Sequence, residues 1–126
     1  MSTAPTKYWL INAACAVVVL LLLGMHMAGI HLDDVMALIF GSNTEPLSWA
    51  QVNARGTSTF MTVSYILLLG TALFHGFYGL HTILTEFWPG PRASRVVLFG
   101  CWAAGIVLFL TGSIATVAFH FQAQVL

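Results

Sequence analysis

Charged residues are scarce in this chain, and neither sign dominates. Only 6% of the 126 residues are charged, and four Lys/Arg balance four Asp/Glu to a formal net charge of zero. A nucleic-acid-binding surface needs clustered lysine and arginine to neutralise phosphates. The composition therefore excludes nucleic acid as a partner.

Cysteine is nearly absent, and so are the short motifs of common soluble enzymes. Cys15 and Cys101 both lie within apolar stretches, and there is no CxxC pair, zinc-ligand spacing, phosphate loop or GxSxG turn. Cysteines in such surroundings behave as small hydrophobic residues. We therefore expect neither a disulfide nor a cysteine-ligated metal.

Hydrophobic residues are abundant, at 59% of the total, and the mean hydropathy of the chain is +0.90. They gather in three segments, at about 8–32, 57–87 and 95–121. Each is longer than the roughly 20 residues that cross a bilayer core. The first run is too long for a signal peptide and lacks a small-x-small cleavage site. We predict an all-α, integral membrane protein, with residues 1–126 forming one transmembrane domain of three helices.

The boundaries of these helices follow from turn-forming and charged residues. Asp33 and Asp34 are expected to end the first helix, before a loop of roughly 25 residues. Trp88-Pro89-Gly90-Pro91 ends the second, because proline cannot continue a helix. This short connection predicts that the second and third helices are antiparallel neighbours. Three spans enclose little interior, so we expect a subunit of a larger assembly.

The few basic residues predict an orientation. Lys7, Arg92 and Arg95 lie at one end of the spans, and Arg55 lies at the other. Basic residues favour the cytoplasmic side. We expect a bacterial inner (cytoplasmic) membrane protein whose amino terminus is cytoplasmic and whose carboxyl terminus is outside.

His75 lies in the middle of the second apolar segment, about 18 Å from Phe87 along a helix. An ionisable residue at this depth usually has a partner or a function. Gly79 follows one turn later on the same face and leaves room for a large flat group. The two residues together indicate a haem, with His75 as an axial ligand and Gly79 in the pocket. The alternative is a histidine that hydrogen-bonds to a neighbouring helix.

The other four histidines are weaker candidates. His26 lies between Met25 and Met27 toward the outer end of the first helix, and is a possible ligand of a second haem. Methionines in an apolar span are otherwise mostly packing residues. His81 lies about 240° around the helix from His75, so the two cannot share one iron. It would instead contact a haem propionate or another subunit. His31 and His120 are expected at the membrane interface.

Glu86, Phe87 and Trp88 end the second apolar segment on the predicted cytoplasmic side. A carboxylate at the mouth of an apolar pocket would suit proton transfer to a quinone. The alternatives are an ordinary polar helix end and an interfacial belt of aromatic residues.

The stretch from Leu73 to Phe87 resembles the small haem-b anchor subunit of succinate dehydrogenase (complex II). That family carries a histidine, a glycine four residues later, and an acidic-aromatic pair at eleven and twelve residues. Here these positions are His75, Gly79, Glu86 and Phe87. The family usually has Thr-Asp-Tyr at the end of the motif, whereas this chain has Thr-Glu-Phe. The motif covers about 15 residues, and the three-span layout covers most of the chain.

The resemblance implies a membrane anchor of a succinate:quinone oxidoreductase or fumarate reductase, which is a tricarboxylic acid cycle and electron-transport complex. Its cofactors would be haem b and a quinone, either ubiquinone or menaquinone. Its partners would be a second membrane anchor subunit, an iron-sulfur subunit and a flavoprotein subunit. The chain would not be catalytic alone, and the second haem ligand would come from the other anchor. In the family the tyrosine hydroxyl contacts the quinone, and Phe87 lacks that hydroxyl.

Two other functions compete with this one. The first is a haem-b subunit of another membrane oxidoreductase, for example one that uses His26 for a second haem. The second is a cofactor-free structural or transporter subunit. A haem absorption band would distinguish both haem proteins from the cofactor-free subunit. Accompanying flavin and iron-sulfur subunits would distinguish the complex II anchor from a subunit of another oxidoreductase.

Overall fold

The computed structural model describes residues 4–40 and 48–125, and the described part of the chain is all-α as predicted. The helices are α1 (Ala4–Phe40), α2 (Trp49–Thr57), α3 (Thr59–Phe87) and α4 (Pro91–Ala123). Three of them are long and apolar enough to cross a membrane, over Thr6–Leu32, Thr59–Phe87 and Pro91–Ala123. The architecture is thus that of a membrane protein with three candidate spans.

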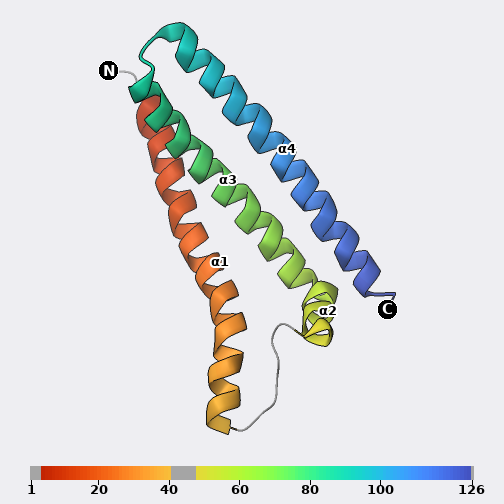
Figure 1. The fold of residues 1–126 in the computed structure, drawn as a ribbon. Coiled ribbons are helices and arrows are strands. Elements are labelled where there is room, and N and C mark those ends of the chain that lie inside the picture. Colours follow the sequence, from red (N-terminus) through yellow and green to blue (C-terminus); the bar gives the residue numbers. More distant parts are fainter. Residues whose placement is uncertain (1–3, 41–47, 126) are drawn as a thin grey trace.

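The helices form an open arrangement with α3 in the middle (Figure 1). α3 packs against both α1 and α4, whereas α1 and α4 do not contact each other anywhere in the described ranges. Among the described residues only Gly56, Thr62 and Ala123 are buried. Most apolar side chains therefore face lipid or another chain.

The first helix is longer than the sequence predicts. Asp33 and Asp34 were expected to end it, but α1 continues to Phe40. No proline or glycine lies between Leu32 and Phe40, so nothing breaks the backbone hydrogen bonding there. Much of the predicted loop is therefore helical. The last residues of α1 occupy its beginning, and α2 occupies its end. Residues 41–47 lie outside the described part of the chain.

Serine residues define both ends of α2. The Ser48 side chain accepts a hydrogen bond from the Gln51 backbone N–H, and so caps the first turn. Ser58 follows the last residue of α2 in an extended conformation and caps α3 in the same way, through the Met61 backbone N–H. One serine thus separates the short helix from the membrane span and starts the span.

A polar cluster around His120 joins the end of α2 to the end of α4. The His120 Nδ1–H donates to the Gly56 carbonyl at 2.8 Å, and the Thr62 hydroxyl oxygen lies 3.2 Å from the same nitrogen. This tautomer leaves Nε2 as an acceptor for the Gln124 amide at 3.0 Å. His120 is therefore a structural residue at this end of the bundle, consistent with its predicted place near the interface.

α4 begins at Pro91, four residues before the predicted start at Arg95, because proline fits the first turn of a helix. Glycines then bring α4 close to α3. A Cβ at Gly112 would lie 2.6 Å from Leu69 Cδ2, and one at Gly105 would lie 3.3 Å from Phe77. Small residues at such crossings permit the close backbone approach on which helix association in membranes depends.

We predict that Gly112→Ile weakens the α3–α4 packing, because the larger side chain displaces Leu69. The expected decrease is about 1–3 kcal/mol of unfolding free energy, as for overpacked cores. Chemical denaturation in detergent micelles measures it. Gly100→Ile is the matched control, since a Cβ at Gly100 meets nothing within 4 Å. Equal stability of the two variants would show that the close approach does not matter.

The orientation predicts which end of the chain is accessible from outside. In a variant without Cys15 and Cys101, Ser94→Cys should resist a membrane-impermeant thiol reagent in intact cells. Thr57→Cys, at the opposite end of α3, should react readily because Thr57 is exposed. The reverse pattern would place the amino terminus outside.

Candidate functional site

His75 lies near the middle of α3, and its side chain is exposed rather than packed between the helices. The neighbouring span α1 passes close by, because Asn12 of α1 lies within hydrogen-bonding reach. An exposed imidazole at this depth faces hydrocarbon or another molecule. It is therefore positioned to bind something that the chain itself does not provide.

The hydrogen bond of His75 determines which ring nitrogen is left for a ligand. Nδ1 lies 3.4 Å from the Asn12 backbone carbonyl, a long contact in which Nδ1–H is the donor. In the tautomer with the proton on Nδ1, Nε2 is the nitrogen left as an acceptor. Metal-bound histidines usually donate their second ring N–H to a carbonyl or carboxylate in this way. The arrangement fits an axial ligand of a haem iron, and the bond to α1 is also what the alternative of a histidine hydrogen-bonded to a neighbouring helix predicts.

Two glycines close to His75 in α3 border open space, and Gly79 is the one on the face of the imidazole. A Cβ built on Gly76 or on Gly79 meets no atom within 4 Å, so both positions border open space. Gly79 lies about 40° from His75 around the helix and one turn along it. A flat ring system has room on this face of α3.

His75 belongs to a row of polar residues along α3. The spacing of these residues is seven, four, seven and four, which places them within about 60° around the helix. They are Ser64, Thr71, His75, Thr82 and Glu86. The three hydroxyl groups donate to carbonyls of their own helix, at 2.8 to 3.0 Å. Their oxygens remain available as acceptors, a pattern that suits a protein neighbour better than lipid.

His26 and His75 are far apart in the structure. His26 lies 14 residues after Asn12 in α1, which corresponds to about 21 Å along the helix. Its ring packs edge-on against Tyr65 of α3, with centroids 5.3 Å apart and an interplanar angle of 83°. The two histidines are therefore not brought together on one iron, and His26 lines a separate cavity with Tyr65.

Of the remaining histidines, none shares the face of His75 at its depth. His81 is half-buried, and its Nε2 has no hydrogen-bond partner among the described residues. His31 is exposed in the carboxyl-terminal part of α1, and His120 belongs to the α2–α4 cluster. A second axial ligand for a haem at His75 would have to come from another chain.

Glu86, Phe87 and Trp88 lie at the end of α3 beside the start of α1, and all three side chains are exposed (Figure 1). Phe87 is 74% exposed and Trp88 is 63% exposed. Their role beside a quinone stays a prediction.

Sequence patterns did not reveal the partner of His75. Asn12 is 63 positions away, and the hydrogen bond uses its backbone carbonyl, which no side-chain pattern encodes. The one available signal was an asparagine inside an apolar span, where a polar side chain is costly. Its Oδ1 is buried and has no partner among the described residues.

Comparisons with protein-family models, curated proteins and solved structures give no match to this chain. The fold and the residues of the site therefore define a class only, a small helical protein with three candidate membrane spans.

Proposed function

We propose that this chain is the haem-b-binding membrane anchor subunit of a succinate:quinone oxidoreductase or fumarate reductase. The observation that carries the proposal is His75, an exposed mid-membrane histidine whose Nδ1 lies 3.4 Å from a backbone carbonyl. The spacing of His75, Gly79, Glu86 and Phe87, which resembles that family, supports it further.

The residues of the chain would position the haem rather than react. His75 Nε2 would bind the iron, while the Asn12 carbonyl fixes the tautomer and orientation of the ring. Gly79 would leave the space for the porphyrin edge. A haem held between two histidines supplies one-electron transfer rather than oxygen activation.

The open arrangement of the helices favours a partner in the membrane. α1 and α4 cover only part of α3, since His75, Thr82 and Glu86 stay exposed, and no other histidine of the described residues shares the depth and face of His75. A second membrane anchor subunit would cover the polar row of α3 and supply the other axial ligand. Iron-sulfur and flavoprotein subunits would then bind at the Glu86 end.

Purification of the tagged protein from its native membranes in mild detergent tests the assembly. A complex II-type complex predicts covalent or tightly bound flavin, iron-sulfur clusters and four subunits on a gel. Haem with neither flavin nor iron-sulfur clusters would favour another membrane oxidoreductase. Absence of haem would favour the structural or transporter alternative.

We predict that Glu86→Gln lowers quinone reductase activity while haem content and assembly stay normal. Glu86 would exchange protons with a quinone bound against Phe87 and Trp88, and glutamine cannot. A single positioned acid or base typically contributes about 10²–10⁴-fold. Steady-state quinone reduction by the purified complex measures the decrease. Turnover equal to wild type would mean that Glu86 is only a polar helix end.

A further inference from the structure

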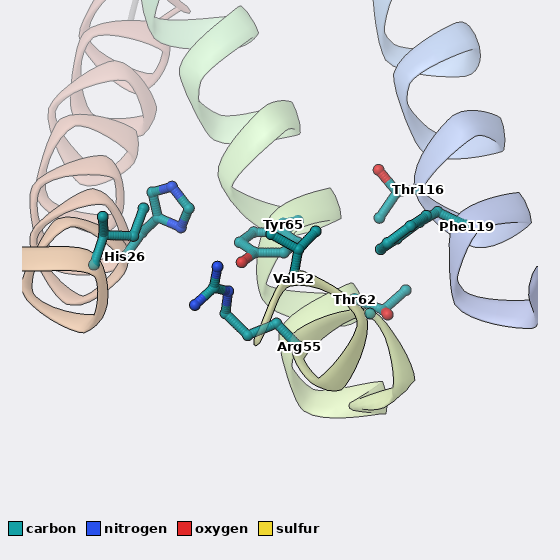
Figure 2. Close-up of a pocket in the computed structure, with 9 residues that line it drawn as sticks. His26, Val52, Arg55, Thr62, Tyr65, Thr116 and Phe119 are labelled. Carbon is teal, nitrogen blue, oxygen red and sulfur yellow. The ribbon is translucent and has the colours of Figure 1, made fainter. Parts of the chain in front are cut away.

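We propose that a second site, at the α2 end of the molecule, binds the phosphate headgroup of a phospholipid. This proposal does not depend on the haem. The site is a cavity of about 390 Å³ to which all four helices contribute. That volume falls within the roughly 300–1,000 Å³ of known ligand sites. Its lining residues include His26, Arg55, Thr62, Tyr65, Thr116 and Phe119 (Figure 2).

The cavity is distinct from the site at His75. Tyr65 lies ten residues before His75 in α3, a separation of about 15 Å along the helix. Arg55 lies in α2, four residues before the start of α3, so the cavity is at the end of the candidate span. This is the depth at which phospholipid headgroups meet the hydrocarbon core.

Polar groups from three helices converge in this cavity. Figure 2 shows the Arg55 side chain extending toward the gap between His26 of α1 and Tyr65 of α3. Arg55 has another interaction in the structure, but a guanidinium carries five N–H donors and can serve more than one acceptor. Its planar fork matches a phosphate in two parallel hydrogen bonds. The phenol of Tyr65 and the imidazole of His26 would add an O–H and an N–H donor.

The apolar walls indicate that the ligand has a lipid tail. Ile30, Val52 and Phe119 form much of the rest of the lining. A free anion would gain nothing from these residues, whereas an acyl chain leaving the headgroup would pack along them. Phosphatidylethanolamine supplies both parts, a phosphate for Arg55 and acyl chains for the apolar wall.

Native mass spectrometry of the protein purified with its accompanying subunits, with phosphatidylethanolamine added to the micelles, tests the proposal. We expect one retained lipid on the wild-type chain. Arg55→Gln should reduce its occupancy by about tenfold, because the charge-assisted hydrogen bonds to the phosphate are removed. Arg92→Gln, an exposed arginine at the other end of the bundle, is the matched control and should retain the lipid.

Two further measurements, on a second variant and with added phosphate, test the proposal if Arg55→Gln folds poorly. Tyr65→Phe removes only a hydroxyl, and should lower occupancy less than Arg55→Gln while helical circular dichroism is unchanged. Excess inorganic phosphate should not displace the lipid from the wild-type protein. Displacement by phosphate would identify a free-anion site and overturn the proposal. Equal lipid retention in wild type, Arg55→Gln and Tyr65→Phe would overturn it as well.

Discussion

Replacing His75 with alanine is expected to remove the proposed b-type haem from the purified protein. Among the described residues, no other histidine shares the depth and face of this imidazole, so the variant chain would supply no ligand to hold the haem there. Mutating a residue that only supports a metal ligand already lowers metal affinity by about 10–100-fold. Removing the ligand itself should cost at least as much, so we expect Soret and α-band intensity per chain to fall by about tenfold or more. Absorption spectra of the purified variant measure this decrease.

The same change should not unfold the protein. The His75 side chain is exposed, so alanine leaves no cavity, and the substitution removes only the long hydrogen bond to the Asn12 carbonyl. His31→Ala, another exposed histidine, is the matched control and should keep its haem. An unchanged low-spin bis-histidine spectrum in His75→Ala would show that the iron is held elsewhere.

Filling the space beside His75 should have nearly as large an effect as removing the ligand. Gly79→Phe adds a ring on the face of α3 that carries the imidazole. A Cβ at this position meets no atom of the chain within 4 Å, so the helix itself tolerates the change. The added ring would occupy the space of the porphyrin edge, and haem content should fall severalfold. Pyridine haemochrome analysis per mole of protein measures the drop.

Gly76→Phe distinguishes this steric effect from a general intolerance of bulk. Gly76 borders equally open space, but its Cβ points about 100° away from His75 around the helix. We expect this variant to keep most of its haem. Equal decreases in both glycine variants would mean that Gly79 has no special place beside the ring.

The sequence predicted the spans well because they depend on a local property. Long runs of apolar residues need internal backbone hydrogen bonds in a bilayer, and a helix supplies them without any tertiary contact. Helix ends were less certain. The acidic pair Asp33-Asp34 suggested an end to α1, yet a helix can pass into water without interruption where no proline or glycine intervenes. The structure extends α1 to Phe40 for that reason.

Sequence patterns could not predict how the helices pack against one another. The bond between His75 and the Asn12 carbonyl, and the packing of His26 on Tyr65, depend on how α1 is aligned along α3. Hydrophobic periodicity does not determine that alignment, because almost every position in these spans is apolar. The row from Ser64 to Glu86 follows from the spacing in α3, but only the structure shows that His75, Thr82 and Glu86 are exposed.

A reduced-minus-oxidised difference spectrum of the purified wild-type protein, with its accompanying subunits and a protein assay, tests the proposed haem site most directly. A haem-b anchor predicts the α band of a low-spin b-type haem, in a stoichiometry of one haem per chain. A preparation that contains the folded chain and its subunits but shows no haem band would contradict the assignment of His75 as a haem ligand.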